Sequence, residues 1–230
     1  MAFKTVLTAL TDRALAEKSV AQAASLARGF DAHLDVISYG VDRTQTGYYY
    51  AGANAMVMQE TLNRAKGDSE ALAAYLRELM AKQDCRWAVE ENVAQLADIG
   101  RTLASRARFS DLVVLPMPYG DGRGVELEPM LEGALFEGHA PVLVLPEEGE
   151  VQAQPKRVVV GWNESNEALN AVRAALPMLQ GAESVHVVVI DPPAHSPSRS
   201  DPGGMLAQWL SRHGVRCDID VLSKTLPRVS

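Results

Sequence analysis

Three glycines at every second position, Gly120, Gly122 and Gly124, mark the segment with the clearest potential for binding chemistry. Alternating glycines allow successive backbone N–H groups to converge on one point, and such a nest binds anions. Arg123 adds one cation to the segment. Two interpretations stay open: a loop that contacts an anionic ligand, or a flexible connection between two elements.

The residues around these glycines weaken a phosphate site. Pro116 and Pro118 precede them, and proline has no backbone N–H to donate. Glu126, Glu128 and Glu132 follow and bring negative charge to the place where an anion would bind. One arginine against three carboxylates predicts a poor phosphate cradle.

A second pair of polar residues, Thr11 and Asp12, follows the first apolar run of the chain. Side chains of this type cap helices, because their oxygen accepts a hydrogen bond from a backbone N–H that has no partner within the helix. Asn163 and Ser165 occupy the corresponding place later in the chain. We therefore expect helix capping at both places.

Catalytic and metal-binding patterns are missing from the sequence. The histidines are scattered, with no i, i+4 pair and no cysteine neighbour, so we expect no metal site. There is no Gly-x-Ser-x-Gly nucleophile turn. Glu90 and Glu91 are adjacent on a predicted strand, where side chains point to opposite faces, so the two cannot flank one bond. We identify no catalytic residue and expect a protein that is not an enzyme.

Strands that alternate with helices position these candidates. In the first part of the chain, strands are predicted over residues 3–10, 33–40, 86–91, 111–115 and 141–145. Helices are predicted over residues 14–28, 55–82, 95–108 and 128–137, with Gly29 ending the first. This alternation predicts an α/β fold with a doubly wound, Rossmann-like parallel sheet of five strands, covered on both faces.

The sequence at the start of the chain is repeated later. The run over residues 4–12 resembles residues 156–164 at an offset of 152, and aligning Cys85 with Cys217 gives an offset of 132. A repeat at so long a spacing predicts two copies of one domain. We expect a complete domain over residues 1–146, a linker over 147–155, and a partial second copy over 156–230 that lacks its last strands. The offsets imply about 20 extra residues in the first copy.

Those extra residues include three consecutive tyrosines, Tyr48, Tyr49 and Tyr50. Clustered aromatic side chains provide a large contact area, which suits a partner-binding patch. A loop folded back on its own domain is the equal alternative.

Composition restricts the partners and the compartment. The net charge of −7 disfavours nucleic acid and anionic membrane surfaces, because binding to either needs clustered Lys and Arg. No apolar run is long enough to span a bilayer. The two cysteines lie in predicted strands without a CxxC pair, which indicates buried structural thiols in a cytoplasmic protein.

The order of these features resembles a universal stress protein domain. The resemblance lies in five alternating strands, a polar turn after the first strand, the run Pro-Val-Leu-Val-Leu-Pro at residues 141–146, and the segment 158–165. It implies a non-catalytic stress-response or signalling protein that acts by binding. Members of that family pair as homodimers or tandem domains and divide into ATP-binding and non-ATP-binding classes.

The resemblance also implies where a nucleotide would bind. The family's phosphate loop, Gly-x2-Gly-x9-Gly-Ser/Thr, follows the fourth strand, and the residue after the first strand contacts the adenine region. Carried onto this chain, the candidates for the nucleotide site are Thr11, Asp12, Met117, Gly120, Gly122 and Gly124. Because a proline stands where the first glycine is expected, we expect no tight ATP binding and no cofactor; the alternative is an ATP-binding stress protein with a divergent phosphate loop.

The second copy is expected to expose part of its sheet. Three strands without the elements that follow them in the first copy leave an apolar face and an edge uncovered. A partner chain, a truncation or a remodelled domain would each account for this. We expect a homodimer built around the first domains, with residues 141–145 available for pairing and the partial second copies packed onto them, and a further protein partner of unknown identity.

Overall fold

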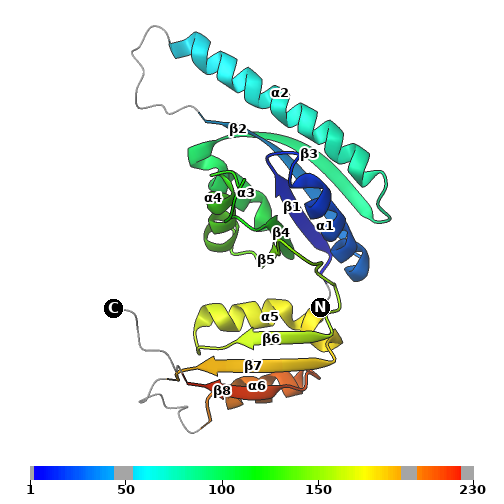
Figure 1. The fold of residues 1–230 in the computed structure, drawn as a ribbon, viewed down its shortest axis with the longest axis vertical. Coiled ribbons are helices and arrows are strands. Elements are labelled where there is room, and N and C mark those ends of the chain that lie inside the picture. Colours follow the sequence, from blue (N-terminus) through cyan, green and yellow to red (C-terminus); the bar gives the residue numbers. More distant parts are fainter. Residues whose placement is uncertain (1–2, 44–53, 193–200, 224–230) are drawn as a thin grey trace. The chain divides into compact units, whose positions relative to one another are not determined.

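The computed structural model describes residues 3–43, 54–192 and 201–223 of the chain. It divides into two compact units, residues 2–153 and 154–230, each with a parallel sheet of its own (Figure 1). The tyrosines at positions 48–50 lie outside the described residues. No helix in the described part of the chain is long and apolar enough to cross a membrane.

The first unit contains a five-stranded sheet in the order β3-β2-β1-β4-β5. Its strands are β1 (Thr5–Leu10), β2 (His33–Asp42), β3 (Arg86–Gln95), β4 (Leu112–Pro116) and β5 (Val142–Leu145). All neighbouring pairs run parallel, which confirms the predicted α/β fold. The chain builds outward in one direction from β1 to β3 and then continues on the other side of β1 with β4. The carboxyl ends of β1 and β4 therefore form the switch point of the sheet.

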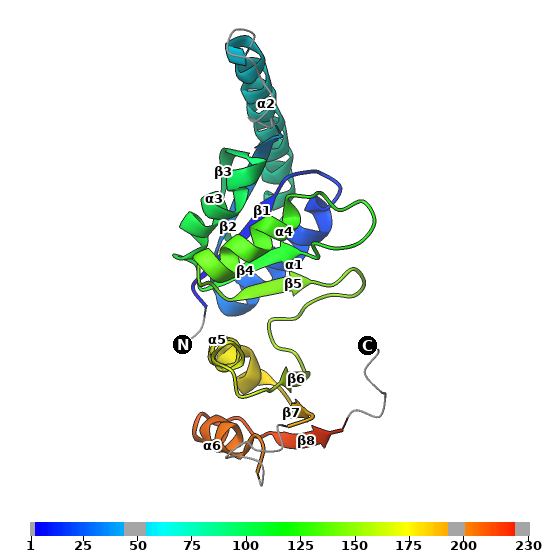
Figure 2. The same cartoon turned by 90° about the vertical axis from the view of Figure 1, so that its left-hand side faces the viewer.

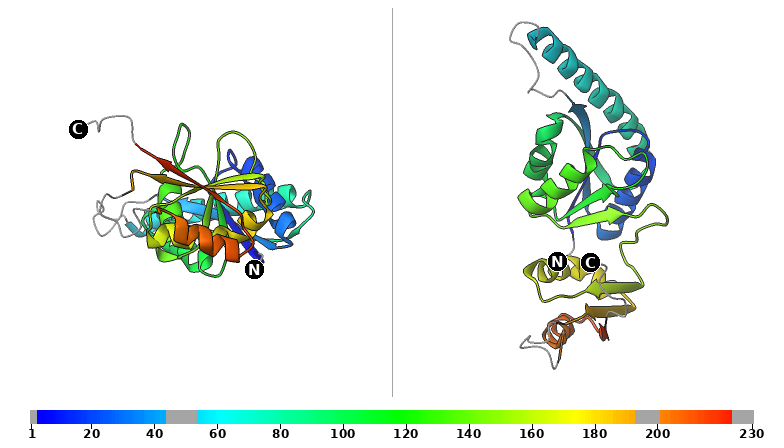
Figure 3. Two further views of the ribbon diagram at one scale, coloured as in Figure 1. Left: turned by 90° about the horizontal axis from the view of Figure 1, so that it is seen from below. Right: turned by 60° about the vertical axis from the view of Figure 1, so that its left-hand side comes forward.

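Helices cover both faces of this sheet (Figure 3, right). One face packs against α1 (Ala16–Phe30) and α2 (Asn54–Met80). The other packs against α3 (Ile99–Ala107), which follows a single 3-10 turn at Leu96–Asp98, and against α4 (Leu127–Glu132), which continues as a π-helical turn over Gly133–Glu137. Leu7, Ile37 and Tyr39 from the strands pack with side chains of α3 and α4 in one buried cluster.

Several boundaries differ from the sequence-based expectation, among them the end of α1 and the end of β3. Gly29 does not end α1; the helix runs to Phe30, and Asp31 takes the left-handed conformation (φ 52°) with its N–H bonded to the carbonyls of Ala27 and Arg28. Aspartate tolerates this conformation better than most residues. Strand β3 runs four residues beyond Glu91, because its pairing with β2 continues as far as Asp42 and Gln95.

The second unit contains β6 (Arg157–Gly161), α5 (Asn166–Gly181), β7 (Ser184–Ile190), α6 (Gly204–Arg212) and β8 (Asp218–Leu222). The strands pair in parallel in the order β6-β7-β8, the same connectivity as β1-β2-β3. Both helices lie on one side of this sheet (Figure 2). Ser165 caps α5 as predicted: its hydroxyl accepts a hydrogen bond from the N–H of Ala168 at 3.1 Å.

Strand register corrects the alignment of the two copies. Thr5 pairs with His33 and His33 with Arg86, whereas Arg157 pairs with Ser184 and His186 with Asp218. Cys217 therefore corresponds to Trp87 and not to Cys85. The offset falls from 152 at the first strands to 130 at the third, so the first copy holds 22 extra residues rather than 20. The alignment of the two cysteines relied on a few neighbouring residues, whereas the register is fixed by the backbone hydrogen bonds along the whole strand.

Candidate functional site

The switch point of the first sheet brings the predicted candidates to one edge. Thr11 and Asp12 follow β1, and Met117 follows the neighbouring strand β4. Met117 leads directly into the loop that contains Gly120, Gly122 and Gly124. Open α/β sheets bind ligands in the crevice outside such carboxyl ends. The candidates therefore lie at the edge where sheets of this type commonly bind ligands.

The polar turn after β1 is organised by Asp12. Its Oδ1 accepts a hydrogen bond from the N–H of Leu15 at 3.1 Å. The helix begins one residue later, at Ala16, and its N-cap residue Leu15 makes no side-chain capping bond. Asp12 therefore caps the turn before α1 rather than the helix itself. Thr11 does not cap: its buried Oγ1 has no hydrogen-bond partner among the described residues.

Two of the three glycines in the loop after β4 need to be glycine for conformational reasons. Gly120 (φ 117°) and Gly122 (φ 72°) have positive φ, which residues with a Cβ rarely adopt. Gly124 serves another purpose, because a Cβ at this position would lie 2.4 Å from Oε1 of Glu126. The third glycine thus makes room for a carboxylate and does not extend an anion-binding nest.

Glu126 is a buried carboxylate beside the loop. Its side chain is 2% exposed, and Arg43 Nη2 lies 3.0 Å from Oε1 and 3.1 Å from Oε2. Arg43 follows β2 directly. The ion pair ties the end of β2 to the start of α4, and it places negative charge next to the glycines.

A second carboxylate reaches the loop from the segment after β5. Glu147 Oε1 lies 3.4 Å from Nη2 of Arg123, whose side chain is 15% exposed. The same oxygen is 2.7 Å from the position that a Cβ of Gly120 would take. Lys18 of α1 donates hydrogen bonds to the carbonyls of Pro146 and Glu147, which hold this segment in place. Sequence reasoning missed Glu147 because it assigned residues 147–155 to a linker.

The electrostatics of the loop follow from these two pairs. Both arginines near the glycines, Arg43 and Arg123, already face a carboxylate. The buried Nε of Arg123 nevertheless has no hydrogen-bond partner in the described part of the chain. An anion at this loop would therefore compete with Glu147 for Arg123, and it would also meet the negative charge of Glu126.

The adjacent carboxylates of β3 do lie on opposite faces, as predicted. Glu90 Oε1 is 2.7 Å from Nη2 of Arg106 on α3, whereas Glu91 Oε1 is 2.9 Å from Nη2 of Arg77 on α2. The two helices cover different faces of the sheet (Figure 3, right). The pair therefore fastens helices to both sides of an edge strand and does not form a two-carboxylate site.

The cysteines are half-buried rather than fully buried. Burial raises the pKa of both thiols, Cys85 and Cys217. Asp218 raises the pKa of Cys217 further, whereas at Cys85 the charge of Arg28 lowers the pKa and that of Asp84 raises it. A thiol with a raised pKa is a weak nucleophile at neutral pH. Within the described residues, no three side chains of His, Cys, Asp or Glu gather as metal ligands.

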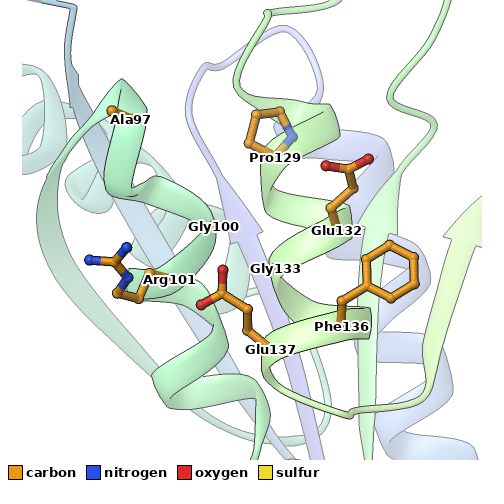
Figure 4. Close-up of a pocket in the computed structure, with 8 residues that line it drawn as sticks. All are labelled: Ala97, Gly100, Arg101, Pro129, Glu132, Gly133, Phe136 and Glu137. Atoms are coloured by element: carbon orange, nitrogen blue, oxygen red, sulfur yellow. The ribbon is translucent and has the colours of Figure 1, made fainter.

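A hollow of about 230 Å³ lies elsewhere, between α3 and the helical segment that begins with α4 (Figure 4). The two segments cross closely, because a Cβ on Gly133 would lie 2.3 Å from the carbonyl oxygen of Gly100. Arg101, Glu132 and Glu137 line the hollow together with Phe136. None of the predicted candidates lines it, and we attribute it to the glycine crossing of the helices.

Comparison with known proteins assigns the fold. No protein-family model and no curated protein matches the sequence. Among solved structures, a universal stress protein from Archaeoglobus fulgidus DSM 4304 is similar over 96% of this chain and 77% of its own, with 12% identity and a TM-score of 0.60. A putative universal stress protein from Pseudomonas aeruginosa UCBPP-PA14 is similar over 96% of this chain and 74% of its own, with 12% identity and a TM-score of 0.50. The chain has the fold of universal stress proteins, as the sequence resemblance predicted.

Proposed function

We propose, from this universal stress protein fold, that the chain is a stress-response or signalling protein that acts by binding other proteins, without catalysis and without tight ATP binding. The observation that carries the proposal is the pair of carboxylates at the loop after β4. Glu126 and Glu147 lie close to the glycines that, in this proposal, a nucleotide phosphate would have to approach. Like charges at such short range disfavour a triphosphate.

Thermal unfolding with and without ligand tests the nucleotide part of the proposal. A ligand that binds only the folded state raises the unfolding midpoint in a concentration-dependent way. We expect no shift with ATP or AMP at millimolar concentration, with or without Mg²⁺. A dose-dependent rise of several degrees, or nucleotide released from the purified protein, would contradict the proposal.

An adenine-nucleotide binder is the second candidate, and one observation favours it. Thr11 Oγ1 and Arg123 Nε are buried without hydrogen-bond partners among the described residues, at the edge where the fold binds ligands. A buried donor without a partner costs about 1–3 kcal/mol, which a bound anion would recover. In that case ATP would raise the unfolding midpoint, and Arg123→Ala would abolish the rise.

We further propose that the chain forms a homodimer through β5. This strand is the edge of the five-stranded sheet next to β4, and its first three residues are only partly buried. An exposed edge offers backbone N–H and C=O groups to a strand of another chain. The sequence-based expectation that the second units also pack onto this dimer stays a prediction.

A further inference from the structure

Among the described residues of the second unit, no helix covers one face of the three-stranded sheet. Helices α5 and α6 pack on the other face (Figure 2). Val160 and Val187 of that face are buried in one cluster with Leu210 of α6. On the open face, Val159 is 70% exposed, Ile190 56% and Leu222 51%. We call this surface, made by the outward residues Val159, His186, Val188, Ile190, Asp218, Asp220 and Leu222, the open face.

The first unit shows what normally covers such a face. By strand register, Val159 corresponds to Leu7 and Ile190 to Tyr39. Those two residues of the first unit are each 1% exposed, because α3 and α4 pack on them. The same positions of the same fold are thus buried by helices in one unit and exposed to solvent in the other. Exposed apolar surface of this kind marks interaction sites.

The charges on the open face indicate which kind of helix fits. In the first unit, Glu90 of β3 lies beside Ile37 of β2. Glu90 forms an ion pair with Arg106 of the covering helix α3, at 2.7 Å. The corresponding residue of the second unit is Asp220, which lies beside Val188. Asp220 Oδ2 is 3.0 Å from Nδ1 of His186 on the same face, and its side chain is 49% exposed. The second unit thus keeps an acidic residue at the position whose counterpart in the first unit binds the arginine of α3.

We propose that the open face binds an amphipathic helix of a partner protein, with an apolar stripe over Val159, Val188 and Ile190 and a Lys or Arg directed at Asp220. A second copy of the face is a poor occupant, because Asp218 and Asp220 would bring like charges together. The inference rests on the proposed function only in that the partner is a protein, and it does not depend on whether a nucleotide binds.

A peptide with the sequence of residues 96–109 is the probe, because it contains α3 with its arginine. Isolated helices of this length are marginal in water, so a lactam joins two exposed positions, Arg101→Glu and Ser105→Lys. Fluorescence anisotropy of the labelled peptide is measured against the full chain. We expect saturable binding, and at least tenfold weaker binding to the Val159→Glu variant, which places a charge in the apolar stripe.

A matched control variant distinguishes binding at the open face from nonspecific hydrophobic binding. Val125, in the first unit, is 68% exposed, nearly as exposed as Val159. Val125→Glu therefore makes the same substitution at a comparable exposed valine and is expected to leave the affinity for the peptide unchanged. The peptide with Arg106→Glu is expected to bind at least tenfold more weakly, and the Asp220→Arg variant is expected to restore its binding. The charge exchange tests the predicted ion pair independently of folding effects.

Three outcomes would overturn the proposal. The first is the absence of saturable binding to the wild-type chain. The second is equal weakening by Val159→Glu and Val125→Glu. The third is a wild-type dimer that Val159→Glu dissociates in light scattering, which would make a second copy the occupant. ATP binding in the thermal assay would overturn the proposed function and leave these results untouched.

Discussion

At the residue scale, the clearest unresolved group in the core is the hydroxyl of Tyr39. It is buried and has no hydrogen-bond partner among the described residues. An unsatisfied buried hydroxyl costs about 1–3 kcal/mol. We therefore expect Tyr39→Phe to be neutral or to stabilise the protein by about 1 kcal/mol at pH 7, measured by urea unfolding. Tyr75→Phe is the contrasting variant, because the Tyr75 hydroxyl donates to Glu17 Oε1 at 2.8 Å and that bond is lost.

Tyr39 also predicts a pH dependence. Burial raises the pKa of Tyr39 well above its ordinary value. A group with a raised folded-state pKa contributes stability that is complete below its unfolded pKa, about 10, and is lost as the pH rises through the folded pKa. The wild-type chain should therefore lose stability relative to Tyr39→Phe above about pH 10. Parallel unfolding curves for the two proteins between pH 7 and pH 11 would contradict this.

Glu147 gives a residue-scale prediction for the site. Glu147→Gln removes the carboxylate that faces Arg123, so the arginine becomes available to inorganic phosphate. Exposed ion pairs contribute about 0.2–1 kcal/mol, and Glu147 is 57% exposed, so we expect phosphate affinity to rise by no more than about fivefold. Isothermal titration calorimetry measures the change. Glu148→Gln is the control; an equal gain there would show that only net charge matters.

At the element scale, two glycines of the first unit predict opposite effects of the same substitution. A Cβ on Gly40 of β2 would lie 1.8 Å from the carbonyl oxygen of Ala65 on α2. Gly40→Ala must push helix and strand apart, which we expect to cost at least about 2 kcal/mol. Gly67 lies within α2 with nothing within 4 Å of its Cβ position, so Gly67→Ala should stabilise by about 0.5–1 kcal/mol. Thermal or urea unfolding measures both, and a neutral Gly40→Ala would disprove the close packing of β2 on α2.

The elements themselves were largely predictable, because their signals are local. Apolar runs such as Leu112–Pro116 and the stripe of Leu72 and Leu76 on α2 predict a buried strand and an amphipathic helix from neighbouring residues alone. The site was not predictable to the same extent. Arg43 meets Glu126 across 83 residues, and Lys18 meets Pro146 across 128. No local pattern specifies such pairs, because they depend on which strands become neighbours in the sheet.

At the scale of the whole molecule, the two sheets differ in how much of each is covered. Helices bury both faces of the first sheet, whereas in the described part of the second unit helices cover one face only (Figures 2 and 3). The repeat in the sequence predicted related connectivity, and the strand order bears this out. Two kinds of surface are therefore available for association: the backbone edge of β5 and the apolar open face of the second sheet. They demand different partners, since an edge pairs with a strand and a face packs against side chains.

The oligomeric state distinguishes these surfaces. Val113 donates its N–H to the carbonyl of Pro141, so the alternation along β5 turns the backbone groups of Val142 and Val144 to the open edge. Val144→Pro removes an outward N–H without breaking the bonds to β4, and proline is tolerated at edge strands. We expect a dimer for the wild-type chain in light scattering at micromolar concentration and a monomer for Val144→Pro. The Val159→Glu variant should remain a dimer in the same measurement. A wild-type monomer would disprove the β5 dimer, and a dimer that survives Val144→Pro would move the interface to another surface.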